Sequence, residues 1–171
     1  MIEVPAAVRD WVKSVLPPEP LLALYIDAPA DDRRWPPESF AALSDHAIEC
    51  LGARTVALSS PSGSFLIERF LSASRNPGRT LVFTNLGLPQ LAGIIGSSNL
   101  LVSNDTGPMH IGPALGVRTL GLFSVGLPEH FRPIGRADHF LKAIPIGNIS
   151  VESVIREVVR MWTSAGRDLP R

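Results

Sequence analysis

The chain has 171 residues, of which 45% are apolar, and it carries 16 acidic and 16 basic side chains. This length and composition predict one globular domain with an ample hydrophobic core. The formal net charge of zero argues against a nucleic-acid-binding protein, because such proteins normally carry a basic excess.

The compartment is suggested by the single cysteine and the lack of long apolar runs. Cys50 has no cysteine partner, so no disulfide can form within the chain and a reducing compartment is expected. The longest apolar runs, such as 21–26, are far shorter than the ~20 residues of a membrane span. The N-terminus has no basic cluster followed by an apolar block. The sequence therefore predicts a cytoplasmic protein without a transmembrane segment.

The pattern divides the chain into two parts. Residues 1–20 predict a helix and a connector, because apolar residues recur at helical spacing and three prolines within 17–20 stop a helix. Residues 21–171 alternate between strand and helix patterns. The predicted strands are 21–26, 55–58, 80–83, 100–102, 117–123 and 140–144, and helices are predicted to begin near residues 35, 64, 89, 108 and 150. This alternation indicates an α/β, Rossmann-like three-layer sandwich with a mainly parallel sheet.

The stretch 103–110 reads Ser-Asn-Asp-Thr-Gly-Pro-Met-His and follows a predicted buried strand. Pro108 suits the first position of a helix, because its missing N–H would be unpaired there. The amides of Thr106 and Gly107 would then lie at the positive end of the helix dipole, a favourable place for a phosphate. The same polar residues could equally serve only as a helix cap, and local chemistry leaves both interpretations open.

The predicted sheet brings this stretch to a common edge with other loops. In open parallel sheets, ligands bind beyond the carboxyl ends of the strands, near the switch in strand order. The loops expected there are 27–34, 59–64, 84–87 and 103–108, with 124–135 as a fifth candidate.

The motif at 103–110, with the apolar helix, Gly116 and the strand at 119–123 that follow it, closely resembles the donor-binding motif of glycosyltransferase family 9. This is the ADP-heptose:lipopolysaccharide heptosyltransferase family. The resemblance covers most of the chain and implies the C-terminal half of a two-domain GT-B enzyme. It implies a nucleotide-sugar ligand, ADP-heptose-like, and a role in lipopolysaccharide or related glycan synthesis, with peripheral association at the inner face of the membrane left open.

The resemblance implies roles for several residues of the motif. It places Asp105, Thr106 and Gly107 against the donor diphosphate and His110 close to the donor. For Asp105, chemistry alone leaves three roles open: shaping the loop, holding a divalent ion, or binding a sugar hydroxyl. The His110 ring could face the ligand or pack against the next strand.

Further contacts are expected outside the motif. Arg33 occupies the position where a family lysine approaches the phosphates, although a solvated charge at a loop end is the alternative. Ser60 and Ser62 could bind ribose through their hydroxyls. Within the motif, Met109 is expected as a core residue or as the wall of a base pocket.

The chain also departs from the family's pattern. Ala28 and Pro29 stand where hydroxyl side chains often precede the phosphate-binding lysine, and Leu127 replaces an acidic residue. Pro113 lies inside the helix that begins at Pro108. An interior proline removes a backbone hydrogen bond and costs roughly 3 kcal/mol in a regular helix, so we predict a kink or an early break near Gly112.

The resemblance also bears on catalysis. The resemblance places the family's catalytic base in the N-terminal acceptor domain, which this chain lacks. We therefore expect no catalytic residue, no cofactor and no transferase activity from this chain alone, and the need for a divalent metal stays open. The chain would be a half of a longer enzyme or a short family member that acts with a separate partner; an exposed apolar strip on 1–16 would favour either.

Two other functions compete with the donor-binding role. A non-catalytic nucleotide-binding or interaction module derived from the same fold is the main alternative. A Rossmann dehydrogenase domain is disfavoured, because the loop at 27–30 lacks the Gly-x-Gly-x-x-Gly turn.

Overall fold

The computed structural model describes residues 3–125 and 139–164. Within these ranges six parallel strands form one sheet in the order β3-β2-β1-β4-β5-β6. The strands are β1 (Leu21–Tyr25), β2 (Arg54–Leu58), β3 (Thr80–Phe83), β4 (Leu100–Asn104), β5 (Arg118–Phe123) and β6 (His139–Lys142). The order reverses between β1 and β4, which is the switch point where open sheets bind ligands. The predicted Rossmann-like α/β fold is confirmed.

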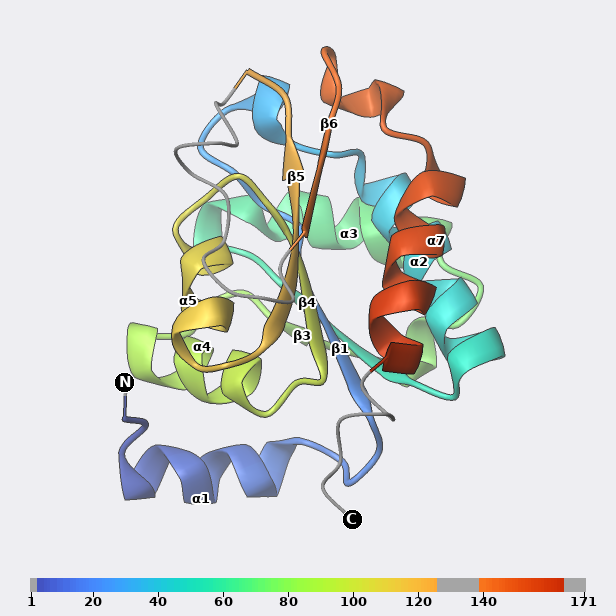
Figure 1. Cartoon of the computed structure of the whole chain (residues 1–171). Helices are drawn as coiled ribbons and strands as arrows, with labels where there is room; N and C mark the ends of the chain where they lie inside the picture. The colour runs from blue at the N-terminus through green and yellow to red at the C-terminus, as the bar shows by residue number, and fades with distance from the viewer. Residues whose placement is uncertain (1–2, 126–138, 165–171) are drawn as a thin grey trace.

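Helices cover both faces of the sheet (Figure 1). They are α1 (Ala6–Val15), α2 (Pro37–Leu51), α3 (Ser64–Ala73), α4 (Leu88–Gly96), α5 (Pro108–Ala114) and α7 (Val151–Ser164). Helices α2, α3 and α7 pack on one face, and α4 and α5 pack on the other, with α1 lying against α4. Because β1 lies in the middle of the sheet, it is buried along its whole length, as its unbroken apolar run predicts.

Helix ends follow local chemistry. Helix α2 ends at Gly52, which takes a left-handed conformation with φ of 64°. Ser150 caps α7, because its hydroxyl accepts a hydrogen bond from the amide of Ser153 at 3.1 Å. Helix α5 ends at Ala114, one residue after Pro113, close to the predicted early break. Gly112 is needed for a different reason: a Cβ there would collide with the Thr119 hydroxyl on β5.

The amphipathic helix α1 does not present an exposed apolar strip. Its apolar side lies against α4, where Gly93 leaves room for Val8 and Val12, and Trp11 packs edge-on against Phe83 at 6.0 Å. Within residues 3–16, therefore, the structure shows no exposed apolar strip of the kind that would favour a missing partner domain, because α4 covers that side of α1. None of the helices in the described ranges has the length and apolar content that crossing a bilayer requires.

Candidate functional site

A polar pocket of about 200 Å³ lies beyond the carboxyl ends of β1, β2 and β4. It is lined by Tyr25, Asp27, Ala28, Pro29, Arg34, Ser60, Ser62 and Thr106. Apart from Tyr25, the last residue of β1, these residues come from the loops 27–34, 59–64 and 103–108, so the prediction that these three loops meet at one edge is confirmed. The pocket lies at the switch point, where the crossovers to the two halves of the sheet diverge.

Asn104, the last residue of β4, holds two of these loops together. It is fully buried. Its Oδ1 accepts a hydrogen bond from the Trp35 amide at 3.0 Å, and its Nδ2 donates to the carbonyls of Ile26 at 3.1 Å and Asp27 at 3.3 Å. Each of these backbone groups would be costly to bury without a partner. Asn104 therefore fixes the loop after β1 against the end of β4.

The turn from β4 into α5 leaves two amides free. The amide of Asp105 donates to the Leu122 carbonyl at 3.1 Å and continues the sheet, while the carbonyls of Thr106 and Gly107 accept hydrogen bonds from the first turn of α5. Neither the Thr106 amide nor the Gly107 amide donates to another residue within the described ranges. Gly107 is exposed, and a Cβ there would meet nothing within 4 Å. The exposed backbone at Gly107 is thus accessible to a ligand.

A buried carboxylate lies in the pocket. Asp27 is only 5% exposed. Its Oδ1 accepts a hydrogen bond from the Ala28 amide at 2.8 Å and lies 3.3 Å from Arg34 Nε, and its Oδ2 accepts hydrogen bonds from the Ser60 hydroxyl and, at 3.3 Å, the Ser60 amide. Asp27 therefore ties the loop after β1 to the loop after β2.

Tyr25 and Ser60 line both this pocket and a neighbouring slot of about 150 Å³. The slot is lined in part by Phe83, Leu86 and Leu91. Burial, and secondarily the negative charge of Asp27, raises the pKa of Tyr25 above its ordinary value of 10.0. The phenol is therefore neutral at physiological pH and can both donate and accept a hydrogen bond.

The structure brings some of the predicted site residues together and separates others. Thr106, Ser60 and Ser62 line one pocket. Among the described residues that line the pocket, the arginine is Arg34 and not Arg33. Arg33 lies in the 3-10 turn Asp31–Arg33 (η1) and Arg34 directly follows it, so the two side chains point in different directions.

The other predicted residues are not among those that line the pocket. Met109 is fully buried, with its sulfur beneath the turn beside Gly121, Asp105 is half-buried, and His110 is exposed on α5. The predicted fifth loop lies outside the described residues apart from its start, where the Ser124 hydroxyl donates to the Asp32 carbonyl.

Sequence reasoning missed Asp27, Arg34 and Tyr25 as lining residues. The available indication was an acidic residue directly after an apolar strand, in a loop expected at the ligand edge. Within the described residues, no group of three or more His, Cys, Asp or Glu side chains is arranged to hold a metal ion.

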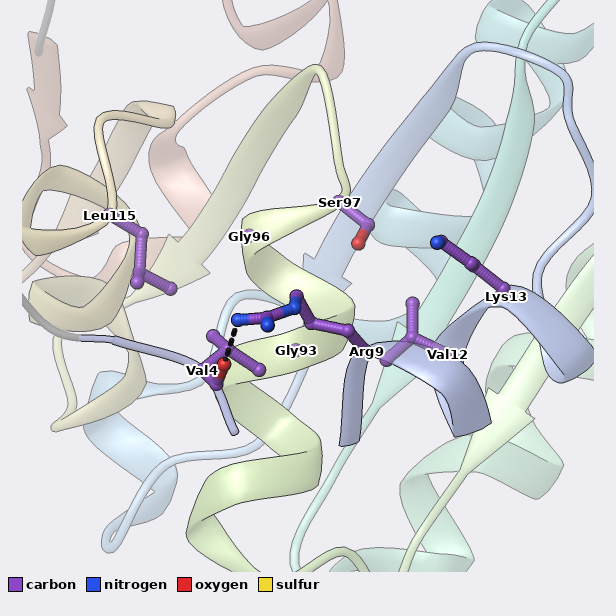
Figure 2. Close-up of a pocket in the computed structure, with 8 residues that line it drawn as sticks. All are labelled: Val4, Arg9, Val12, Lys13, Gly93, Gly96, Ser97 and Leu115. Atoms are coloured by element: carbon purple, nitrogen blue, oxygen red, sulfur yellow. Dashed lines mark hydrogen bonds between the residues drawn. The ribbon is translucent and has the colours of Figure 1, made fainter. Parts of the chain in front are cut away.

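A second hollow, of about 250 Å³, lies between α1 and the C-terminal half of α4 (Figure 2). Its floor is apolar, formed in part by Val12, Gly93 and Leu115. Arg9 crosses it to donate to the Val4 carbonyl at 2.6 Å. Because α4 leads from this end into β4, the hollow lies near the edge where strands begin, away from the polar pocket.

Comparison with known proteins relates this architecture to glycosyltransferases. The family model of glycosyltransferase family 9 (heptosyltransferase) matches residues 7–150. No curated protein sequence matches the chain.

Three solved structures share the fold. E. coli ADP-heptose LPS heptosyltransferase II aligns with a TM-score of 0.87 and 18% identity, over 97% of this chain and 54% of that one. A family 9 glycosyl transferase from Veillonella parvula aligns with a TM-score of 0.86 and 23% identity, over 95% and 53%. E. coli heptosyltransferase WaaC with ADP aligns with a TM-score of 0.75 and 18% identity, over 91% and 49%.

The chain spans about half the length of each of these proteins. At such low identities the likeness establishes the fold alone. The family match, in contrast, extends from within α1 to the start of α7 and includes the whole sheet. The chain therefore belongs to glycosyltransferase family 9.

Proposed function

We propose that this chain is the donor-binding half of a glycosyltransferase, with an ADP-heptose-like nucleotide-sugar as its ligand. The observation that carries this proposal is the position of the 103–110 motif, since Thr106 lines the polar pocket at the switch point of a family 9 fold. Ligands of open α/β sheets bind at this place.

The free amides of Thr106 and Gly107 support a diphosphate position beside the pocket, because backbone N–H groups bind anions well. Arg33, in the 3-10 turn after β1, and His110, in the first turn of α5, are proposed as further donor contacts. Ser60 and Ser62 are proposed to bind ribose, and Met109 to support the turn from below.

Transfer of the sugar requires a second domain in this proposal. A base must deprotonate the acceptor hydroxyl while the departing diphosphate is stabilised. The residues described here serve the second need, and we assign the base to an acceptor-binding domain in the same gene or in a separate chain. A role in lipopolysaccharide synthesis at the inner face of the membrane belongs to the same proposal.

A non-catalytic nucleotide-binding module is the second candidate. It is favoured by Ala28 and Pro29, which line the pocket without offering a hydroxyl to a phosphate. Sugar transfer after addition of a family acceptor domain would separate the two candidates, since a module would bind the nucleotide without supporting turnover.

Calorimetric titration with ADP, ADP-glucose, UDP-glucose and pyrophosphate tests the proposal. We expect ADP and ADP-glucose to bind. Gly107→Val should lower the affinity for ADP at least tenfold, because its side chain would obstruct the free amides. Asp105→Ala should lower this affinity less. Because position 107 is open to solvent, Gly107→Val should keep the wild-type melting temperature.

Ser97→Ala, at the hollow between α1 and α4, is the matched control and should bind ADP as the wild type does. Failure of every nucleotide to bind at millimolar concentration would overturn the proposal, as would an unchanged affinity of Gly107→Val.

A further inference from the structure

The charge in the polar pocket is unusual for a phosphate site. Asp27 contributes a buried carboxylate, and Arg34 contributes the lining cation. The Arg34 guanidinium forms ion pairs with Asp27 and Asp31 and donates to the Ala28 carbonyl at 2.9 Å. Its positive charge is therefore already compensated, and a phosphate placed against Asp27 would meet repulsion without a free cation among the described lining residues to offset it.

The other polar groups of the pocket are hydroxyls. Ser60 and Ser62 lie with their oxygens 3.0 Å apart, and Tyr25 and Thr106 complete the lining. Hydroxyls both donate and accept, and a carboxylate accepts at up to four positions. Such a set matches a neutral ligand that has several hydroxyls. The pocket volume of about 200 Å³ is smaller than the roughly 300–1,000 Å³ of sites that enclose a whole small molecule, so it fits one ring of a larger ligand.

The local backbone is shaped around the Asp27 carboxylate. Gly63, in the 3-10 turn Pro61–Gly63 (η2), lies against it, and a Cβ at position 63 would be 2.9 Å from Asp27 Cγ and closer still to Oδ2. The φ of Gly63 is −90°, which any residue can adopt. The close approach of the carboxylate, rather than backbone conformation, therefore requires glycine here.

One partner of Asp27 can be exchanged for a ligand. The Ser60 hydroxyl donates to Oδ2 and is itself half-buried in the pocket wall. Rotation about one side-chain bond frees Oδ2 for a ligand hydroxyl, while the Ala28 amide and Arg34 continue to hold Oδ1.

We propose that this pocket binds the vicinal hydroxyls of a sugar ring of the ligand, and that Asp27 is the specificity-determining residue that accepts their hydrogen bonds and excludes phosphate. The proposal rests on the function proposed above, and it places the diphosphate outside the pocket, beside Thr106 and Gly107. The ring is the ribose or the transferred sugar, and the experiment distinguishes them.

The test compares wild type, Asp27→Asn and the control Asp31→Asn by calorimetry with ADP, 2′-deoxy-ADP, 3′-deoxy-ADP, ADP-glucose and pyrophosphate. If ribose fills the pocket, the wild type should prefer ADP to the deoxy analogues about tenfold, and Asp27→Asn should reduce this preference to about twofold. If the transferred sugar fills it, the preference for ADP-glucose over ADP should collapse instead. In both cases Asp27→Asn should bind pyrophosphate at least as well as the wild type.

Asp31→Asn removes a carboxylate from the same arginine but outside the pocket, so it should keep the wild-type preferences. Gly63→Ala provides a second variant if Asp27→Asn does not fold. Its Cβ would displace the Asp27 carboxylate, so it should also reduce the preference for ligand hydroxyls.

Unchanged preferences in Asp27→Asn, or weaker pyrophosphate binding in it, would overturn this assignment and leave the donor-binding proposal intact. A wild type that binds no nucleotide would instead refute the donor-binding proposal, and this assignment with it.

Discussion

The polar pocket beyond β1, β2 and β4 and the hollow between α1 and α4 differ in how their polar groups are held. In the pocket, the Asp27 carboxylate is buried and has partners on two loops. In the hollow, Arg9 and Lys13 are exposed charges on one helix, above an apolar floor. The hollow is the larger of the two, at about 250 Å³ against about 200 Å³.

The larger of the two hollows is therefore not the one whose polar groups are held in place by the fold. The hollow exists because Gly93 and Gly96 leave space where α1 crosses α4, so it follows from helix packing. The pocket exists because separate loops are held at fixed positions by buried hydrogen bonds, an arrangement that preorganises polar groups for a ligand. We therefore expect substitutions at the two places to separate binding from stability.

The largest expected difference is between substitutions of two asparagines, Asn104 and Asn99, which hold opposite ends of the central strands. Asn104→Ala would leave the buried amide of Trp35 and the carbonyl of Ile26 without their partner, and we expect a loss of about 3 kcal/mol in the free energy of unfolding. Because the loop after β1 would also shift, the affinity for ADP should fall more than tenfold. Urea denaturation and calorimetry measure the two effects.

The matched control for that substitution is Asn99→Ala. Asn99 accepts a hydrogen bond from the Leu21 amide at 2.8 Å, at the beginning of β1 and far from the pocket. Its loss should cost about 1 kcal/mol, since one partly exposed hydrogen bond disappears, and ADP affinity should stay within twofold. If the two substitutions changed the affinity for ADP equally, the expectation that only the edge at the carboxyl ends of the strands takes part in binding would be contradicted.

Filling the hollow should affect stability without affecting binding. In Gly93→Leu the new side chain would enter the space held by Val8 and Val12, whose methyl groups lie 2.9 and 2.8 Å from an added Cβ. Overpacking of this kind costs about 1–3 kcal/mol, measured by urea denaturation. Gly96→Ala, whose Cβ would meet only Leu115 at 3.3 Å, should be nearly neutral. A several-fold change in ADP affinity in Gly93→Leu would mean that α1 communicates with the pocket.

The fold could be predicted from the sequence because its elements depend on local patterns. Unbroken apolar runs predicted the central strands, and Gly52 predicted the end of α2 through its left-handed conformation. The meeting of the loops followed from strand order alone. The covered face of α1 could not be predicted, because an amphipathic helix shows that it has an apolar side but not which element covers it.

The details of the pocket depend on contacts between residues distant in the sequence. Asp27 and Ser60 are 33 positions apart, and their hydrogen bond exists only because β1 and β2 are neighbours. Arg33 and Arg34 are adjacent and chemically alike, so nothing in their chemistry indicates that Arg34 rather than Arg33 lines the pocket. Whether Arg33 contacts a bound donor stays a prediction.

The smallest expected effect is a change in the titration of Tyr25, the only tyrosine of the chain. Burial and the charge of Asp27 raise its pKa above 10.0, so tyrosinate absorbance should appear at higher pH than in the unfolded protein. A raised pKa of an acid means that the folded state holds its proton longer. Its contribution to stability is therefore complete below pH 10 and is lost as the pH rises through the pKa of the folded state.

Asp27→Asn should lower this pKa, because it removes the nearby negative charge but leaves the burial of the ring, which is the larger cause. Lys13→Met, at the hollow, should leave the titration of Tyr25 unchanged. If the wild-type tyrosine ionised at its ordinary pKa, its hydroxyl would be fully hydrated and the charge of Asp27 would not reach it. The titration would then contradict the expectation that polar groups interact with one another in the pocket but are solvated in the hollow.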